Sequence, residues 1–589
     1  MMIGLSAAVI AIQVFAQTVS CEYWTTATDR YWNTKHPARP TSTPSTVSSA
    51  YGGGGPTATV DAGILIGTTT SLPAATASVN KFLGIPFANT PPVRFAPPEK
   101  PANFGIINAT AWRPACIQQF QYPLASQLFT EAIFNNPAPQ ESEDCLYLNV
   151  YAPSTPAPAD GRSVMYWIYG GSLQFGNAGQ IYYDGSSFAS YEDVIVVTVN
   201  YRTNVFGFPT TSELPATGHN LGFLDQRLGL DWVQRNIKAF GGSPKKVTIF
   251  GESAGAFSVD ALLTSFPANS TPPFRAAILQ SGQYSYAVAP KISPTQAQVP
   301  WAQLSAALGC PGTYASNLTC LRAANATAIK DVIEKQELTF SPIADNVTLV
   351  QNPAQQRISG NIAGIPILSG TDAQEGRVFA VGQTNFTAYI SGLFGASSAL
   401  VESITAAYPS SFGSDYDRAA AVFTDYVFTC PTALVANDTA TLRTPAWRYY
   451  FNASFPNTQA YPGLGVYHSS EIPIVFGTYA KTNVTTQEYA LSNTMMGAWA
   501  RFAKNPAGGP GWNRIGTGTS GVVLEGATQA AIGGLYTDGS GNTIDGTFDL
   551  GVLGNRGDVL GSGVTVVDQS EADSRCGVFL PVYQALTGL

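Results

Sequence analysis

The most constraining feature of this chain is the hexapeptide FGESAG at residues 250–255, and residues 246–250 predict a short buried strand that leads into it. Ser253 lies between Gly251 and Gly255 in a Gly-x-Ser-x-Gly pattern, which is typical of a sharp turn from a strand into a helix. Such a turn leaves no room for side chains at the two glycines and exposes the serine hydroxyl. The pattern predicts a nucleophilic serine that forms an acyl intermediate. The alternative is an ordinary glycine-flanked turn, which a chain with 57 glycines also produces.

The segments around this serine alternate between strand and helix patterns. Two runs of β-branched and aromatic residues, 164–169 and 194–199, predict strands that are buried on both faces. Residues 221–240 predict a helix that ends at Gly241-Gly242, because apolar residues recur at steps of three and four: Leu224, Leu228, Val233, Ile237 and Phe240. The remaining predicted elements are strands 247–250 and 276–279 and the helix 256–263. The alternation of strands and helices indicates a parallel sheet wound with helices.

A serine hydroxyl becomes a good nucleophile only when a neighbouring imidazole takes its proton, and the chain has three histidines, His36, His219 and His468. In folds of this kind the order along the chain is serine, acid, histidine, and only His468 follows Ser253. His468 lies in the loop-like stretch 465–471. We therefore predict that His468 is the base; the alternative for an isolated histidine is a purely structural role.

The imidazole needs a carboxylate that accepts its Nδ1–H and stabilises the imidazolium. The clearest candidates are Asp372 and Glu375, which follow the strand-like run 365–368. Either side chain has a suitable length, so the chemistry leaves the choice open and makes the other residue a turn or cap residue.

The tetrahedral oxyanion needs backbone N–H donors, and one comes from the residue after the nucleophile, Ala254. The glycine-rich turn 169–172, directly after a predicted strand, is expected to supply the others. The alternative is an ordinary Gly-Gly turn.

Four further motifs accompany the serine: KFLGIPFA at 81–88, EDCLYLNV at 143–150, NYR at 200–202 and DQR at 225–227. With them, the chain resembles the type-B carboxylesterase and lipase family, which includes the cholinesterases and fungal lipases, over about residues 62–589. The resemblance implies an α/β-hydrolase fold, with a large, mixed, mostly parallel twisted sheet flanked by helices and a disulfide-closed flap loop. It places this fold in one domain, residues 57–589.

Carried over position by position, the resemblance assigns the acid to Glu375 and the base to His468. The oxyanion donors are the amides of Gly171, Ser172 and Ala254, and Glu252 lies near the catalytic histidine. The chain departs from the family pattern where a third glycine and an aromatic residue are usual, since it has Ser172 and Leu173. Ser172 therefore places a side chain where the acyl group would pass.

The resemblance also orders the cysteines, of which six of the seven could otherwise pair in 15 ways. It implies the disulfides Cys116–Cys145, Cys310–Cys320 and Cys430–Cys576, and it leaves Cys21 unpaired. It further implies two buried structural ion pairs, Arg94 with Glu143 and Arg202 with Asp225.

The loop closed by Cys116 and Cys145 corresponds to the flap over the site and is rich in apolar residues: Phe120, Tyr122, Leu124, Leu128, Phe129, Ile133 and Phe134. We expect it to cover an apolar pocket, and the alternative is that these side chains only pack the loop down. The loop contains no Trp, the best aromatic for a quaternary ammonium, which disfavours a choline ester.

Several features predict secretion. Residues 1–16 form an apolar stretch with small residues before the expected cleavage site, typical of a signal peptide, although Lys and Arg are missing from its front; the alternative is a buried N-terminal helix. A Ser/Thr/Pro/Gly-rich leader, 17–56, follows. No later stretch is expected to span a bilayer. Nine sequons predict a glycoprotein: Asn108, Asn269, Asn317, Asn325, Asn346, Asn385, Asn437, Asn452 and Asn483.

The formal net charge of −8, without a basic run, argues against nucleic-acid partners. Three scattered histidines and no cysteine pair with ligand spacing predict no metal site and no cofactor. The leading hypothesis is a secreted serine carboxylesterase acting on small to medium, fairly apolar esters. The first alternative is a lipase acting on triacylglycerols at a lipid interface; the second is a non-catalytic cholinesterase-like binding or adhesion protein.

Overall fold

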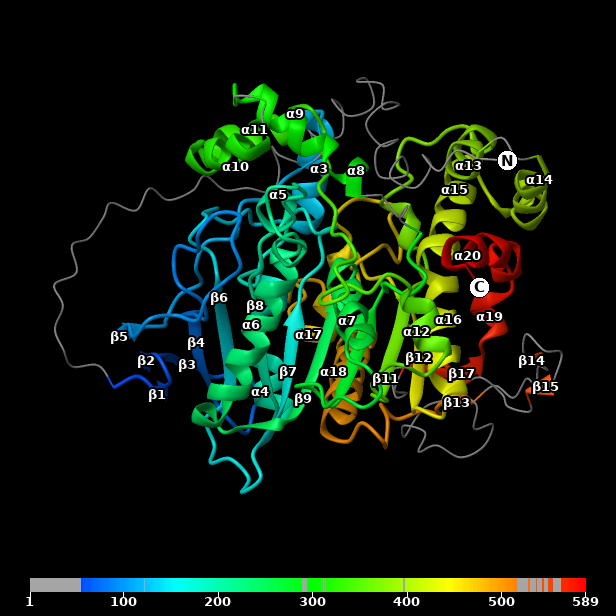
Figure 1. Ribbon diagram of the computed structural model, residues 1–589. Coiled ribbons are helices and arrows are strands. Elements are labelled where there is room, and N and C mark those ends of the chain that lie inside the picture. The colour runs from blue at the N-terminus through cyan, green and yellow to red at the C-terminus, as the bar shows by residue number, and fades with distance from the viewer. Residues whose placement is uncertain are drawn as a thin grey trace.

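The strand that leads to Ser253 lies in the middle of the largest sheet in the computed structural model (Figure 1). The structure describes residues 54–120, 122–288, 294–310, 312, 314–395, 398–515, 528–529, 536–537, 543–544, 549–554 and 563–588. The predicted signal peptide, most of the predicted leader, His36 and Cys21 lie outside these residues.

Twelve strands form this sheet, in the order β13-β17-β16-β12-β11-β10-β9-β7-β8-β6-β4-β3. The central strands from β8 to β16 run parallel, whereas β3, β4, β6 and β17 pair antiparallel, so the sheet is mixed and mostly parallel, as predicted. In chain order, the strands are β3 Thr68–Thr70, β4 Val79–Pro86, β6 Tyr147–Pro153, β7 Arg162–Ile168, β8 Ile195–Val199, β9 Gly242–Glu252, β10 Ala276–Gln280, β11 Ile367–Asp372, β12 Ala446–Asn452, β13 Thr528–Gln529, β16 Asp549–Gly554 and β17 Val564–Asp568. A smaller sheet contains β1 Thr57–Val60, β2 Gly63–Ile66 and β5 Gly105–Asn108, and β14 Tyr536–Thr537 pairs with β15 Thr543–Ile544.

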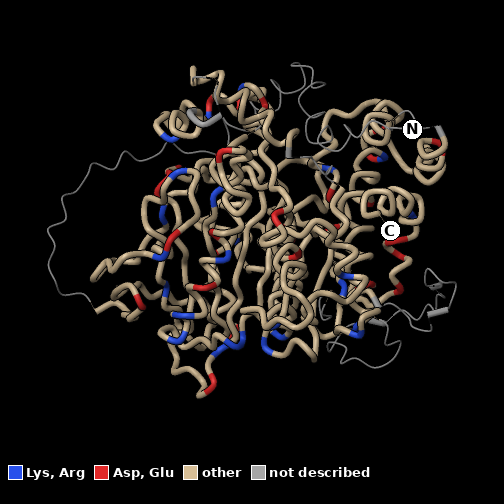
Figure 2. Tube along the Cα trace, in the orientation of Figure 1, with Lys and Arg blue, Asp and Glu red and all other residues tan. Residues whose placement is uncertain are grey.

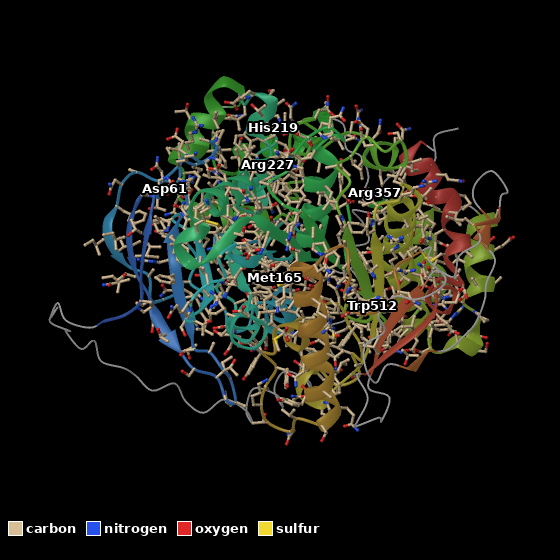
Figure 3. The ribbon with its side chains drawn as sticks, turned by 90° about the horizontal axis from the view of Figure 1, so that it is seen from below. Asp61, Met165, His219, Arg227, Arg357 and Trp512 are labelled. Carbon is tan, nitrogen blue, oxygen red and sulfur yellow. A yellow bond between two sulfur atoms is a disulfide. The ribbon has the colours of Figure 1, made fainter. Side chains whose placement is uncertain are left out.

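Helices cover both faces of the sheet. Figure 3 shows Arg227 of α6 and the orange helix α18 on opposite sides of Met165, a fully buried residue of β7. This double cover explains why all residues of β7, β8 and β10 are buried and why their sequences are nearly continuous apolar runs. The helices are α3 Leu124–Phe134, α4 Ser186–Glu192, α5 Asn204–Gly207, α6 Leu221–Asn236, α7 Ala254–Ser265, α8 Pro294–Ala297, α9 Val299–Ala307, α10 Tyr314–Ala323, α11 Ala326–Lys335, α12 Pro353–Ile358, α13 Phe386–Phe394, α14 Ser398–Ala407, α15 Asp415–Phe423, α16 Cys430–Thr441, α17 Ile472–Phe476, α18 Thr486–Lys504, α19 Ser570–Asp573 and α20 Leu580–Thr587.

The predicted apolar stripe of the helix over residues 221–240 is wrong in part. Leu224 and Leu228 are only half-buried, whereas Gly229 is buried. The reason is a close approach to β7, because the Tyr166 hydroxyl donates a hydrogen bond to the Gln226 carbonyl and fills the space that a Cβ at position 229 would need. The last four predicted residues form a 3₁₀ turn, Ile237–Phe240, which ends at Gly241 with a φ of 82°.

One segment is long and apolar enough to pass as a membrane span by length and composition alone, but it is mostly buried inside the protein. It runs from Asp415 to Thr441 and joins α15 and α16 through a π-helical turn, Thr424–Thr429. In its most apolar window 83% of the residues are buried inside the protein. Its apolar character therefore fits a core helix, since Ala420, Val422, Phe423 and Val435 all belong to the core.

The three disulfides implied by the resemblance are present: Cys116–Cys145, Cys310–Cys320 and Cys430–Cys576. Charged residues are sparse along the chain, and both signs are interspersed (Figure 2). Arg202 and Asp225 form a buried ion pair at 2.8 Å. Arg94 and Glu143 also pair, with 2.7 Å between Nε and Oε1, but the Glu143 side chain is 27% exposed, so this pair is not fully buried.

The sequons differ in accessibility. Asn317 is buried within α10, where an attached glycan would have to displace packed side chains, and we therefore remove it from the predicted acceptors. Asn437 is half-buried. The other seven are exposed: Asn108, Asn269, Asn325, Asn346, Asn385, Asn452 and Asn483.

Candidate active site

Ser253 lies at the junction of β9 and α7 with φ 57° and ψ −122°, a conformation that costs energy for a residue with a side chain. Its N–H donates to the Gln280 carbonyl at 2.9 Å, which fixes the turn to β10. A Cβ at Gly251 would lie 2.6 Å from the carbonyl carbon of Gly255, and a Cβ at Gly255 would overlap the Ile168 carbonyl oxygen. The close approach of three backbone segments thus requires both glycines.

His468 lies in the loop that precedes α17, and its imidazole reaches the end of β11. The Nδ1 atom is 2.6 Å from Oε2 of Glu375, and both side chains are buried. Asp372 does not contact the imidazole; its backbone N–H donates to Oε1 of Glu375, and its Oδ2 accepts from the Ser470 hydroxyl at 3.2 Å. Of the two carboxylates that the chemistry left open, the one in contact with His468 is Glu375.

The other imidazole nitrogen faces a second carboxylate. The Nε2 atom of His468 lies 3.1 Å from Oε1 of Glu252, which also accepts a hydrogen bond from the Ser469 hydroxyl at 2.5 Å. In the described part of the chain, no hydrogen bond joins Ser253 to His468, although both residues line the same cavity. Catalytic hydrogen bonds are often absent or long before substrate binds.

Four carboxyl groups are buried around this one imidazole: Glu252, Asp372, Glu375 and Glu471. Within the described residues, none of them forms an ion pair with Lys or Arg. Oε1 of Glu471 accepts from the Gln280 side chain at 2.9 Å, and Gln280 is held in turn by the indole of Trp499. The buried carboxyl groups of Asp372 and Glu471 hydrogen-bond each other, which, besides burial, is one cause of the raised pKa of Asp372.

Burial and mutual repulsion set the protonation of this cluster. Burial raises the pKa of Asp372 well above its usual range, and the charges of Glu471 and Glu375 raise it further. Burial also raises the pKa of Glu252 to about 8, although the neighbouring His468 favours its ionised form. Burial alone would lower the pKa of His468, but the carboxylates of Glu252 and Glu375 outweigh it and raise that pKa to about 9.

Aromatic rings enclose the imidazole on its remaining sides. The ring centroid of Phe428, from the π-helical turn, lies 4.7 Å from that of His468, and Phe379 lies at 5.2 Å. Phe134 of α3 approaches at 6.3 Å. These rings exclude water from the imidazole, which strengthens its interactions with the nearby carboxylates.

The predicted oxyanion turn lies beside the serine. Gly171, Ser172 and Leu173 have φ values of 101°, 56° and 59°, which turn the chain sharply after β7. Among the described residues, no group accepts a hydrogen bond from the N–H of Gly171, Ser172 or Ala254. A Cβ at Gly170 would lie 2.9 Å from the Cβ of Ser253. This turn is therefore in close contact with the elbow, the tight turn between β9 and α7 that carries Ser253. These three amides are thus free to bind an oxyanion.

Two cavities meet at Ser253. The first cavity, of about 540 Å³, is lined by His468, Glu252, Gly171, Phe134 and Tyr461. The second cavity, of about 610 Å³, is more apolar and is lined by Ala254, Phe257, Phe340, Leu393 and Val427. Ser253, Ser172 and Phe379 line both cavities.

The disulfide-closed loop contributes to both cavities and is also packed down in part. Leu128, Ile133 and Phe134 line the first cavity, and Phe120 and Tyr122 line the second. Phe129 is buried and lies 5.2 Å from the ring of Tyr461, whereas Tyr122, Leu124 and Leu128 are 42–57% exposed. Part of the loop therefore lines the two cavities, as expected, whereas Phe129 packs the loop down onto the protein.

Comparison with known proteins identifies the family. Residues 55–535 match the carboxylesterase family. This chain belongs to the carboxylesterase family. The family resemblance, the fold class and the carboxylic-ester hydrolase activity predicted from the sequence are thereby confirmed.

Curated relatives support this assignment. The chain is 36% identical over 454 residues to a para-nitrobenzyl esterase of Bacillus subtilis, covering 73% of this chain and 87% of the relative. It is 35% identical to an acetylcholinesterase of Bungarus fasciatus over 469 residues, 74% of this chain and 76% of the relative. It is 33% identical to a human cocaine esterase over 476 residues, 76% of this chain and 83% of the relative.

The site also contains residues that were not predicted from the sequence. Ser469 and Glu471 follow His468 in the same loop, and their closeness to the predicted base along the chain could have identified them. Phe428 carries no local signal, because only the tertiary fold brings the π-helical turn against the imidazole. His219 lines neither cavity, and its Nε2 hydrogen-bonds the Thr211 carbonyl. In the described part of the chain, no cluster of His, Cys, Asp and Glu is arranged to hold a metal.

Proposed function

We propose that this carboxylic-ester hydrolase works through an acyl-serine intermediate. The Ser253 hydroxyl oxygen attacks the ester carbonyl carbon while Nε2 of His468 takes the hydroxyl proton. The same proton passes to the alkoxide oxygen as the ester bond breaks and the alcohol leaves. Water then attacks the carbonyl carbon of the acyl-serine and gives a proton to His468. His468 passes this proton to the Ser253 oxygen as the bond between that oxygen and the acyl carbon breaks, which releases the carboxylic acid and regenerates the free serine.

The observation that carries this proposal is the arrangement around the first cavity. The first cavity is lined by Ser253, by His468 and by the oxyanion turn with its free amides. Oε2 of Glu375 lies 2.6 Å from Nδ1 of the imidazole. Glu375 fixes the ring orientation and stabilises the imidazolium. In the substrate complex Nε2 of His468 must contact the Ser253 hydroxyl, so it must give up or share its present contact with Glu252.

The direct test is Ser253→Ala. We expect its kcat on p-nitrophenyl butanoate to fall by about 10⁴-fold or more, because the nucleophile is lost while the cavity stays intact. The matched control is Ser403→Ala, which removes an exposed hydroxyl that bonds only within α14. Near-wild-type turnover by Ser253→Ala would contradict the proposal.

For the substrate, the apolar second cavity supports small to medium, fairly apolar esters. One observation favours the lipase alternative, since Tyr122, Leu124 and Leu128 expose apolar surface at the loop beside the cavities. A lipase would show a jump in rate when a triacylglycerol exceeds its solubility limit. A carboxylesterase that acts on dissolved esters would show ordinary saturation through that limit.

We further propose that the chain is secreted and that residues 57–589 form one domain. Three disulfides and seven exposed sequons support an oxidising, glycosylating compartment. Expression in a secretory eukaryotic host should release a protein that begins at Gln17 and loses mass on treatment with an N-glycosidase. Retention inside the cell with an intact N-terminus would contradict secretion.

A further inference from the structure

Three residues line both cavities and so form the junction between them. Of the residues that line both cavities, Ser253 is the proposed nucleophile and Phe379 packs against the imidazole. The third is Ser172, which is exposed, whereas every residue of the preceding strand β7 is buried. No described residue hydrogen-bonds its hydroxyl, so its side chain is not held for a structural purpose.

The chemistry orients an ester across this junction. The leaving oxygen must receive its proton from His468, and His468 lines the first cavity but not the second. The alcohol portion therefore extends into the first cavity. The acyl portion, on the other side of the carbonyl carbon, extends toward the apolar second cavity and passes Ser172.

Ser172 lies close to the carbon where the acyl chain begins. If its amide donates to the oxyanion, bond lengths place its Cβ within about 5 Å of that oxygen. Its φ of 56° is in the left-handed region, which glycine adopts without cost. A glycine here would keep the turn and remove the only side-chain atoms of this residue from the junction.

We propose that Ser172 is a specificity-determining residue of this carboxylesterase: its Cβ occupies the space beside the acyl α-carbon and selects esters of acids that are unbranched at that carbon. The inference rests on the proposed function. The apolar second cavity then receives the remainder of a linear acyl chain, so that the preferred substrates are esters of straight-chain acids.

The test compares Ser172→Gly with Ser172→Ala, which removes the hydroxyl and keeps the Cβ. For each variant we would measure kcat/KM for three p-nitrophenyl esters: the 2-methylpropanoate and the trimethylacetate, which are branched at the α-carbon, and the linear butanoate. The acyl ratio is kcat/KM for a branched ester divided by kcat/KM for the butanoate. We expect the ratio to rise about tenfold in Ser172→Gly, the effect of one methylene-sized space, and to change less than about threefold in Ser172→Ala. Thermal unfolding should show that both variants fold.

Branching on the alcohol side serves as an internal control. The ratio for isopropyl against propyl butanoate should stay the same in Ser172→Gly, because the alcohol lies in the other cavity. An unchanged acyl ratio in Ser172→Gly, an equal rise in Ser172→Ala, or an equal rise in the alcohol ratio would each overturn the inference.

The same panel separates this inference from the proposed function. If Ser253→Ala retains hydrolysis, the acyl-serine mechanism fails and the role of Ser172 fails with it. If Ser253→Ala is inactive and the acyl ratio in Ser172→Gly stays flat, only the role of Ser172 is wrong.

Discussion

The imidazole of His468 lies within hydrogen-bond distance of two carboxyl groups, Glu375 on Nδ1 and Glu252 on Nε2. Both favour the protonated ring, yet the proposed base must be neutral to accept the serine proton. The fold therefore stabilises the imidazolium that forms during the reaction at the expense of the free base. The charge beside Nε2 is expected to set the pH range in which the enzyme works.

Replacing Glu252 tests this electrostatic role. In Glu252→Gln, loss of the negative charge should lower the pKa of His468, so that the neutral base is available at lower pH. We expect the acidic limb of the kcat/KM profile to move down by about 1 pH unit. A limb that stays in place, or moves up, would show that Glu252 does not control His468. The control is Glu402→Gln, which removes an exposed carboxylate of α14.

The local sequence does not determine which carboxylate contacts His468, although the family resemblance assigns that role to Glu375. Asp372 and Glu375 both follow β11 and are both buried, and nothing local distinguishes them. Only the tertiary path of the loop around His468 places Nδ1 on Glu375 and leaves Asp372 against Ser470. Likewise, the clustering of four carboxyl groups around one imidazole is not predictable from the sequence, because they come from three separate segments.

At the scale of elements, the strand β9, the elbow and the helix α7 depend on glycines at two positions. The strands and helices near Ser253 were predictable because their apolar periodicity is strong and both faces of the sheet are covered. The apolar stripe of α6 was not, because it depends on how closely Tyr166 of β7 approaches the helix. The π-helical turn, which carries Phe428 to the imidazole, has no periodic signature.

Two glycine-to-alanine substitutions, one in the elbow and one in an exposed helix, test the packing of the elbow. We expect Gly255→Ala to lower the free energy of unfolding by about 3 kcal/mol or more, because its Cβ would overlap the Ile168 carbonyl. Gly392→Ala, in the exposed part of α13, has open space around the new Cβ. It should raise stability by about 0.5 to 1 kcal/mol through helix propensity. Equal effects in denaturant unfolding would contradict this account of the elbow.

At the scale of the whole molecule, the disulfides join distant parts of the chain. Cys430–Cys576 ties α16 to the C-terminal helices across 146 residues, whereas Cys310–Cys320 spans only 10. In the chain-entropy model, a longer closed loop restricts the unfolded chain more strongly. The pairing itself came from the family resemblance, since the spacing of seven cysteines does not determine it.

Removing each disulfide by a double Cys→Ala change gives a comparison. Loss of Cys430–Cys576 should cost about 4 to 5 kcal/mol and loss of Cys310–Cys320 about 3 kcal/mol or less, so the first variant should unfold at the lower temperature. A larger destabilisation on loss of Cys310–Cys320 would contradict the prediction. Calorimetry of both variants beside the unmodified protein provides the measurement.

The central claim is that Ser253 is the nucleophile and that His468 activates it. The most direct measurement is covalent labelling with a p-nitrophenyl alkylphosphonate, followed by mass spectrometry of the peptides. We expect one phosphonyl group per chain on Ser253, with release of one p-nitrophenol, and a labelling rate that falls by at least about 10²-fold in His468→Ala. Stoichiometric labelling of another residue, or an unchanged rate in His468→Ala, would contradict the claim.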